Sequence, residues 1–404
     1  LFTTFTKSLV SASHYLLNSL LPSGGRHQVQ VVNTDKLVHA YLPQNPKMLN
    51  VPKWDKWPAV LSSSLEECRK TDSAFAFTSN DSDFLYEEVD WVIFGQGLTS
   101  IEQYLEADRG GRGRPLGSQQ RRHVWRLFES FHRKLREQHF GLFSEFAAEA
   151  ARAVKPRFDY VFIDEAQDLT PAAIRFCIGL CKAPSNVFLT ADGNQSIYGN
   201  GLSWTRVASD LRFVGRARTL NKNYRTTKEI WQAIGQLAPE AQDTDQETLA
   251  LGAVFSGLHP LFARYETWPQ QMARLNSFLF DALREERVGP GCSAVLCPSN
   301  KDASVVASQL DQRLNPKAML SSEVDLSHPG VKVLTMHAAK GLQFPVVGVV
   351  RVENGRIPQT VRGGTDQQEN NARQQRLLFV ACSRAMRRLA LFGSRTRPSP
   401  FVSR

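Results

Sequence analysis

The chain has 404 residues, and its 49 lysines and arginines outnumber its 39 acidic residues, which gives a formal net charge of +10. This length predicts two or three domains with hydrophobic cores of their own. No apolar run approaches the ~20 residues of a membrane span, and residues 1–6 lack the features of a signal peptide. The six cysteines show no metal-ligand spacing. We therefore expect a cytoplasmic protein with reduced thiols and no membrane partner.

Positive charge is concentrated in two stretches. Residues 109–136 hold nine lysines and arginines and one acid, Glu129, and residues 370–404 hold eight arginines and no acid. Such asymmetry favours nucleic acid as the partner over a membrane, because no apolar helix face accompanies it. A solvated basic surface is the alternative. If the first stretch binds DNA without ATP, its affinity should fall steeply with salt.

The first 150 residues begin with two short strands and continue with helices. Strands are expected at residues 1–5 and 29–32, with a helix at 6–21 between them. Residues 46–149 predict a mainly helical, basic region. Its glycine-rich loop carries Arg112 and Arg114 but lacks the Gly-Lys-Ser/Thr ending of a phosphate loop. We expect this loop to contact phosphates or to be disordered.

An apolar run at residues 160–163 ends abruptly in Asp164-Glu-Ala-Gln-Asp168. This pattern is typical of a buried parallel strand with polar residues at its carboxyl end, where open α/β sheets bind ligands. On an extended strand, Asp164 and Glu165 would face opposite ways. One carboxylate would then hold hydrated Mg²⁺ while the other orients or deprotonates a water. The alternative is a strand that ends in a solvated acidic turn.

Further strands are predicted at residues 186–192, 293–297, 331–336, 346–352 and 389–392, with helices between them. Strands and helices that alternate over two halves predict two α/β domains with parallel sheets. We expect a first domain at residues 1–45 and 150–214, the helical insertion at 46–149, and a second domain at 215–404. The second domain should carry only a minimal insertion, around residues 239–290.

Six segments follow one another along the chain: Phe2-Thr-Thr-Phe-Thr-Lys7, Asp164-Glu-Ala-Gln-Asp168, Ala191-Asp-Gly-Asn-Gln-Ser-Ile-Tyr198, Asn223-Tyr-Arg-Thr226, Thr335-Met-His-Ala-Ala-Lys-Gly-Leu-Gln-Phe-Pro345 and Leu377-Leu-Phe-Val-Ala-Cys-Ser-Arg-Ala385. In this order they resemble motif Ia, the Walker B motif and motifs III, IV, V and VI of UvrD/Rep-type superfamily 1 DNA helicases. The resemblance spans nearly the whole chain. It implies two RecA-like domains in tandem and an ATP-dependent DNA helicase or translocase, with 3′→5′ polarity expected.

The resemblance also implies roles for individual residues. For ATP hydrolysis it assigns Asp164 to Mg²⁺, Glu165 to the attacking water, and Gln195, Arg225 and Arg384 to the phosphates. For ATP binding it points to Tyr224, Gln343, Asp192 and Gln167. Single-stranded DNA and its junctions with duplex would meet Phe5, Lys7, Thr34, His337, Lys340 and Trp204, and charge adds Arg112 and Arg114. Core positions for Phe5, Tyr224 and Trp204 and a capping role for His337 are the alternatives. A monomer is expected.

Two departures from the family pattern stand out. Gln343 takes the place of a glutamate that meets the ribose, so a hydrogen bond survives there but the charge does not. No Gly-x-x-x-x-Gly-Lys-Ser/Thr occurs in the 404 residues. Without that loop the β- and γ-phosphates lose most of their cradle. We expect that truncation before motif Ia removed the loop and left the first domain incomplete and this chain inactive as an ATPase. A non-hydrolysing, nucleic-acid-binding scaffold or regulator is the alternative.

Overall fold

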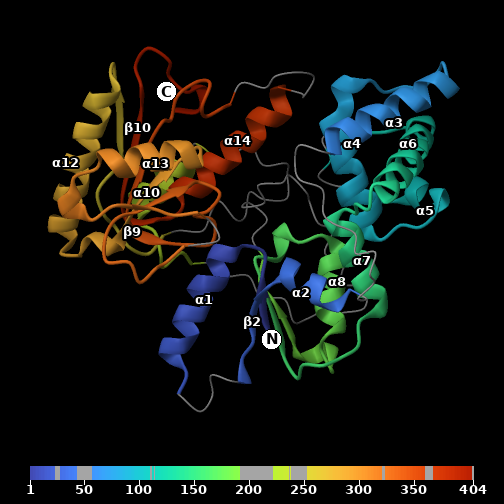
Figure 1. Cartoon of the computed structure of the whole chain (residues 1–404). Helices are drawn as coiled ribbons and strands as arrows, with labels where there is room; N and C mark the ends of the chain where they lie inside the picture. Colours follow the sequence, from blue (N-terminus) through green and yellow to red (C-terminus); the bar gives the residue numbers. More distant parts are fainter. Residues whose placement is uncertain are drawn as a thin grey trace.

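The computed structural model describes residues 1–22, 28–42, 57–109, 112, 114–191, 222–235, 237, 253–320, 324–359 and 367–402. These residues form two α/β domains and a helical insertion (Figure 1). Both sheets are parallel throughout, which confirms the predicted fold class. Among the described helices, none is long and apolar enough to cross a membrane.

The first domain is built on a four-stranded sheet with the order β2-β1-β3-β4. Its strands are β1 (Phe2–Thr4), β2 (Val31–Asn33), β3 (Val161–Asp164) and β4 (Val187–Leu189). Side chains alternate across a strand, and Val161 and Ile163 pack into the core formed with helices α2 (Thr34–Tyr41), α7 (Phe143–Ala153) and α8 (Pro171–Gly179). The opposite face presents Phe162 and Phe188, whose stacked rings lie 4.9 Å apart and which are 42% and 51% exposed.

The helical insertion has its own hydrophobic core. It consists of α3 (Trp57–Thr71), α4 (Ser82–Glu87), the π-helix η3 (Glu88–Phe94), α5 (Ile101–Glu106) and α6 (Ser118–Glu137). Helix α6 buries an apolar stripe at positions 124, 127, 128, 131 and 135, the spacing of one face of an α-helix. The buried residues of helix α7 belong to the hydrophobic core of the first domain and not to that of the helices before it.

The second domain is built on a six-stranded sheet with the order β5-β10-β9-β6-β8-β7. Its strands are β5 (Leu261–Tyr265), β6 (Ser293–Cys297), β7 (Lys317–Ala318), β8 (Lys332–Thr335), β9 (Phe344–Val349) and β10 (Ala385–Ser394). Helices α12 (Trp268–Glu286) and α13 (Asn300–Gln309) share one core with the sheet, and α10 (Lys228–Gly235) and α14 (Gln367–Cys382) share the other. Residues 268–286 are therefore a helical layer of this domain, while residues 238–252 lie outside the described part.

Short 3-10 helices connect several of these elements. They are η2 (Ser79–Asp81), η4 (Ala166–Asp168), η5 (Pro184–Asn186), η7 (Pro290–Cys292), η8 (Gln312–Leu314) and η9 (Pro400–Val402).

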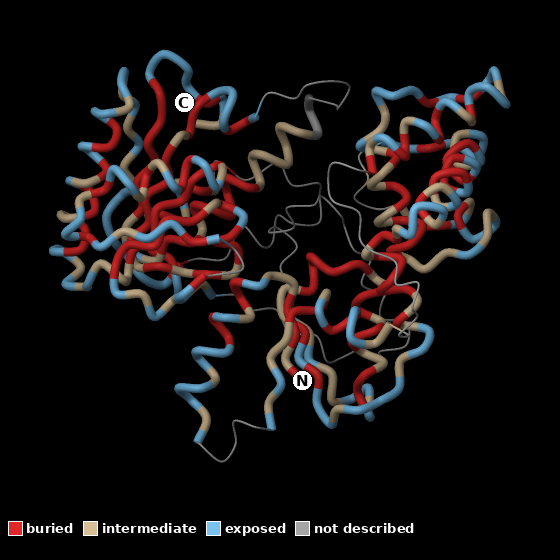
Figure 2. Tube along the Cα trace, viewed as in Figure 1, coloured by how far each residue is buried: buried red, intermediate tan, exposed pale blue. Residues whose placement is uncertain are grey.

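Helix α1 (Lys7–Leu20) belongs to the first domain by sequence but also packs against the second. The hydroxyl of Thr6 caps it by accepting a hydrogen bond from the amide of Leu9 at 3.2 Å. Leu9 and Ala12 are buried in the same hydrophobic core as residues of β9 and α14. Figure 2 shows that the end of α1 farther from the second domain is exposed. The first turns of α1 therefore join the two α/β domains.

Candidate functional site

Strand β3 delivers Asp164 to the carboxyl end of the first sheet, as its apolar run predicts. In the parallel register Asp164 lies beside Thr4 of β1. The hydroxyl of Thr190, which directly follows β4, donates a hydrogen bond to the carboxylate of Asp164. The hydroxyl of Thr4 is buried without a hydrogen-bond partner in the structure. Three neighbouring strands thus bring hard oxygen groups to one edge of the sheet.

Glu165 does not continue the strand, contrary to the expectation that it would face opposite Asp164 on extended backbone. The strand ends at Asp164, and Glu165 adopts φ +54° and ψ +44°, in the left-handed region. Residues other than glycine rarely occupy this region unless the surrounding structure imposes it, and such positions cluster at functional sites. The side-chain amide of Gln167, a buried residue, donates a hydrogen bond to the Glu165 carboxylate. The turn, rather than strand alternation, therefore sets the direction of Glu165.

The third acid of the run, Asp168, faces the second domain. Its carboxylate forms an ion pair with the ammonium group of Lys340, and the side chains are 0% and 3% exposed respectively. Lys340 was predicted to contact nucleic acid. The structure instead encloses its charged group at the junction of the two α/β domains.

The residues of the first segment lie around the start of α1. Lys7 is exposed in the first turn, and Phe5 is half-buried against the core of the first domain. Thr34 is fully buried, and its hydroxyl lies 2.9 Å from that of Thr3 and donates to the carbonyl of Thr4 at 3.3 Å. Lys7 is thus accessible to DNA, whereas the Thr34 hydroxyl serves the packing of β1 against α2.

Asn223 organises the turn that carries Tyr224 and Arg225. Its side-chain oxygen accepts hydrogen bonds from the amides of Arg225 at 2.9 Å and Thr226 at 3.1 Å. The turn leaves Tyr224 58% exposed and Arg225 exposed as well. The ring of Tyr224 is therefore on the surface, not in a core, and both side chains are accessible to a ligand.

Arg384 lies in the interior of the second domain, where it is 3% exposed. Its guanidinium donates to the carbonyl of Val380 at 2.9 Å, to that of Leu342 at 3.4 Å and to the hydroxyl of Ser383 at 2.8 Å. Gln343, next to Leu342, is half-buried. All three of these acceptors belong to the second domain.

His337 lies in the turn after β8, close to two cations. Desolvation by the surrounding protein, then Arg373 and Lys340, lower the pKa of its imidazole to about 4. His337 itself is exposed. At neutral pH its ring is therefore neutral and accessible, and it can stack on a base or form a hydrogen bond.

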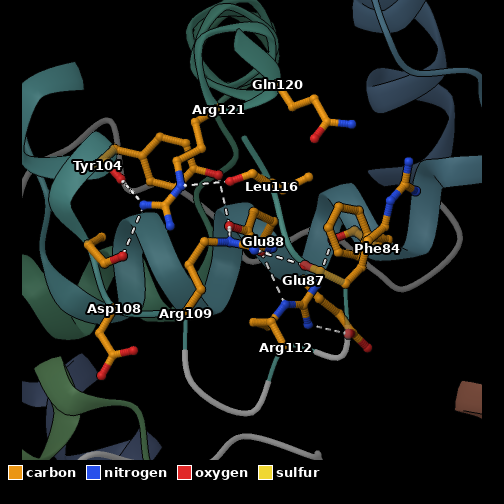
Figure 3. Close-up of polar contacts among 12 residues, drawn as sticks. Phe84, Glu87, Glu88, Tyr104, Asp108, Arg109, Arg112, Leu116, Gln120 and Arg121 are labelled. Atoms are coloured by element: carbon orange, nitrogen blue, oxygen red, sulfur yellow. Dashed lines mark hydrogen bonds and ion pairs between the residues drawn. The ribbon is translucent and has the colours of Figure 1, made fainter. Parts of the chain in front are cut away.

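The basic stretch at residues 109–136 is paired with acids of the helical insertion. Arg109 and Arg112 both contact Glu88, a fully buried residue that also accepts a hydrogen bond from the hydroxyl of Tyr104 at 2.8 Å (Figure 3). Arg112 also pairs with Glu87 at 2.6 Å. Further along the stretch the ion pairs are Arg114–Asp81, Arg126–Asp72, Arg133–Glu67, Lys134–Glu67, Arg136–Glu145 and Arg136–Glu149. The charge excess counted along the chain is therefore largely balanced in space.

Burial alone would raise the pKa of Glu88, but Arg109 and then Arg112 outweigh that effect and hold its pKa below the ordinary value. Arg112 is only 4% exposed, whereas Arg114 is 43% exposed. Of the two loop arginines predicted to bind nucleic acid, Arg114 alone presents a guanidinium at the surface. Three other predicted site residues, Asp192, Gln195 and Trp204, lie outside the described residues.

Two family models match separate parts of the chain. The model of the UvrD/REP helicase N-terminal domain matches residues 123–202, and that of the UvrD-like helicase C-terminal domain matches residues 312–396. These two parts of the chain are similar to the N-terminal and C-terminal domains of UvrD-like helicases. The two matches fall in separate parts of the chain, in the order that the six motifs predict.

Among individual UvrD/Rep-like relatives, DNA helicase II of Escherichia coli is 35% identical over 75 residues, which are 19% of this chain and 10% of that protein. The probable DNA helicase of Mycoplasma pneumoniae is 23% identical over 272 residues, 63% of this chain and 48% of that protein. ATP-dependent DNA helicase UvrD1 of Mycobacterium leprae is 34% identical over 144 residues, 33% of this chain and 18% of that protein. The matched regions thus cover less than half of each of these relatives.

One solved structure is the C-terminal domain of a possible DNA helicase from Lactobacillus plantarum WCFS1. It aligns with a TM-score of 0.33 at 21% identity and covers 45% of this chain and 92% of that chain.

Several residues with clear structural roles were absent from the sequence-based predictions. Thr190 holds Asp164, Asn223 shapes the turn of Tyr224, and Glu88 organises the basic loop. Thr190 lies within the segment predicted as a strand, residues 186–192, where a threonine carries little signal by itself. The sequence Asn-Tyr-Arg-Thr did contain a signal for Asn223, because asparagine side chains commonly accept hydrogen bonds from amides two and three residues on.

Replacing Glu88 by alanine should destabilise the helical insertion by about 3–5 kcal/mol, because Arg109 and Arg112 would remain buried without their carboxylate. Urea unfolding followed by tryptophan fluorescence measures this change, since Trp57 and Trp125 lie in that core. Glu67→Ala, which breaks an exposed pair with Arg133, is the matched control and should have a much smaller effect. Equal effects of the two substitutions would contradict the structural role of Glu88.

His337 should make stability depend on pH. Its pKa of about 4 in the folded protein lies below the unfolded value of about 6.5. Stability from this group is therefore complete above about pH 6.5 and is lost as the pH falls toward 4, because the unfolded chain binds the extra proton. Urea unfolding of wild type and His337→Gln across this range should show a shallower decline in the variant. Parallel declines would show that His337 does not titrate in this way.

Proposed function

We propose that this chain is part of an ATP-dependent DNA helicase or translocase that moves 3′→5′ on single-stranded DNA and acts at junctions with duplex. The observation that carries the proposal is the edge of the first sheet, where Asp164, Glu165 and Thr190 meet beside a second α/β domain. Ligands of open α/β sheets bind at the carboxyl ends of the strands. The relatives named as DNA helicases support the choice of substrate.

The donor set at this edge suits Mg²⁺. The metal prefers oxygen ligands and usually takes one or two carboxylates, with waters and substrate phosphates completing the octahedron. Asp164 supplies a carboxylate, and the unpartnered hydroxyl of Thr4 lies beside it in register. Among the described residues, no group of three or more His, Cys, Asp or Glu side chains could hold a metal ion by itself. In the proposed site the phosphates of ATP would share the coordination. When bound, the metal would neutralise charge on the phosphates.

The protein's own part in hydrolysis falls to Glu165. Its carboxylate leaves the strand through a left-handed turn and is oriented by the buried amide of Gln167. From this position Glu165 orients a water and accepts its proton, the role of a general base. The constrained turn keeps the carboxylate in one direction before substrate arrives, which reduces the ordering needed in the transition state.

The second domain contributes two arginines, one exposed to solvent and one buried. Arg225 is exposed on the turn after Asn223 and can approach a phosphate directly. Arg384 is bound to the carbonyls of Val380 and Leu342 and to Ser383. It reaches a nucleotide only after exchanging these partners, so ATP binding and the position of Arg384 would be coupled.

Single-stranded DNA would run across the junction of the α/β domains. Lys7 offers a cation, and His337, which is exposed, offers a neutral ring. Tyr224 is assigned to the adenine by the resemblance, and its exposed ring suits stacking on a base. Because Arg109 and Arg112 are paired with Glu88, the basic stretch contributes to DNA binding through its exposed members, such as Arg114.

One observation favours a second function. The 404 residues contain no Gly-x-x-x-x-Gly-Lys-Ser/Thr segment, and the amides and lysine of that segment hold the β- and γ-phosphates in the relatives of this fold. A protein without it would bind nucleic acid but not turn over ATP, as a scaffold or regulator. The arrangement of Asp164 and Glu165 favours the enzyme.

An ATPase assay of the full-length native protein distinguishes these two functions. It should hydrolyse ATP, with stimulation by single-stranded DNA, and Glu165→Gln should lower kcat by at least about 100-fold while DNA affinity is unchanged, because the amide cannot accept the proton. Phosphate release measured with and without a poly-thymidine oligonucleotide gives the answer. DNA binding without hydrolysis in the wild type would support the scaffold, and unchanged hydrolysis in Glu165→Gln would exclude the assigned base.

A further inference from the structure

A buried ion pair joins the two α/β domains. The ammonium group of Lys340 lies against the carboxylate of Asp168, and the two side chains are 3% and 0% exposed. Asp168 ends the 3-10 helix η4, which begins directly after Glu165. Lys340 follows β8 in the turn that also carries His337. The pair therefore connects the acidic turn of the candidate ATP site with the candidate DNA contact.

Because the ion pair between Asp168 and Lys340 is buried, it is favourable in only one arrangement of the two domains. Each buried charge loses its hydration, and the attraction between the partners compensates only when both are in place. If either side moves by a few ångströms, a charge remains enclosed without its counterion or water must enter. The pair consequently favours one seating of the turn at 336–343 on the first domain.

Apolar contacts between the domains lie next to the ion pair. Gly341, adjacent to Lys340, has φ +78°, and a Cβ atom there would lie 3.0 Å from Cδ2 of Leu9 and 3.1 Å from its Cδ1. Leu9 in turn shares a hydrophobic core with Leu342 and Phe344 of the second domain. The glycine thus permits both the left-handed backbone and the close approach of α1. The ion pair and the apolar packing therefore hold the same segment, the turn at 336–343.

A further ion pair reaches the helical insertion. Arg373 of α14 lies 3.4 Å from Glu87 of α4, and Figure 1 shows the end of α14 directed toward α4. Arg373 is also among the cations that lower the pKa of His337. The two cations that act electrostatically on His337 are therefore each paired with an acid, Lys340 with Asp168 and Arg373 with Glu87.

We propose that Asp168 and Lys340 are positioning residues that seat the turn at 336–343 on the first domain, so that His337 is aligned with Lys7 for DNA. This inference deepens the proposed function and rests on it for the identity of the ligand. The pair transmits position rather than charge to the DNA, because Lys340 is enclosed. A change in the turn of Asp164 and Glu165 would move Asp168 and thereby His337.

The seating is tested by hydrogen exchange in the wild-type 404-residue chain, Lys340→Met, Asp168→Asn and the double variant. Each single change should accelerate amide exchange both in residues 164–170 and in 335–345, because each leaves the opposite charge buried. The double variant should exchange more slowly than the sum of the single effects predicts. The exposed pair Lys182–Asp159 within the first domain, 56% and 75% exposed, provides the matched control cycle and should change neither segment.

Gly341→Ala gives an independent variant that keeps both charges. Strain at the positive φ and contact with Leu9 should accelerate exchange in α1 and in residues 335–345. The proposed role of the ion pair is overturned if each single substitution accelerates exchange only in its own domain. It is also overturned if the effects of the two substitutions on the exchange rates are simply additive in the double variant. Should Lys340→Met and Asp168→Asn fail to fold, Gly341→Ala still decides whether α1 and the turn respond together.

Affinity for a fluorescent poly-thymidine oligonucleotide supplies the functional readout. Lys340→Met and Asp168→Asn should each weaken binding about tenfold, within the usual range of coupling between sites, and the Lys182 control should not. Wild-type affinity in both single variants overturns their positioning role. If the wild-type chain binds no single-stranded DNA while the exchange results hold, the proposed function fails and the seating of the turn remains.

Discussion

The carboxylate of Asp168 is fully enclosed and lies against the ammonium group of Lys340, and the arrangement of the candidate site depends on this contact. The two residues are 172 positions apart and belong to different sheets. Their burial means that neither charge is stable alone, so the first and second domains are matched to each other at this point. The close contact between Leu9 and Gly341 adds apolar packing at the same junction. The acidic turn and the turn of His337 are therefore parts of one structural unit.

Buried ion pairs also account for the position of the basic loop in the helical insertion. Glu88 begins a π-helix and is surrounded by Tyr104, Arg109 and Arg112. Irregular helical turns of this kind often occur at functional positions, but here the side chains satisfy one another. A stretch that is strongly basic along the sequence thus becomes a set of internal ion pairs. The proposed DNA-binding surface therefore rests on the exposed residues at the domain junction, Lys7 and His337, and not on the whole basic stretch.

Local patterns were sufficient to predict the sheets and the position of the acids. The apolar run before Asp164 predicted β3, and the strands around the motifs were found with ends shifted by a few residues. The edge strands β5 and β7 were not predicted, because a partly exposed strand of two to five residues has no continuous apolar run. The left-handed turn at Glu165 and the partners of Arg112 and Lys340 depend on segments far away in the sequence. No local pattern encodes such contacts.

The account places DNA across the junction of the α/β domains, and ultraviolet cross-linking followed by mass spectrometry tests that placement most directly. A poly-thymidine oligonucleotide bound to the 404-residue chain should cross-link to peptides that contain Phe5 or His337, because aromatic rings near bases react most readily and these residues lie in the segments that precede α1 and follow β8 at the junction. Cross-links confined to α6 in the helical insertion would contradict this placement and would show that the basic stretch at residues 109–136 binds the DNA.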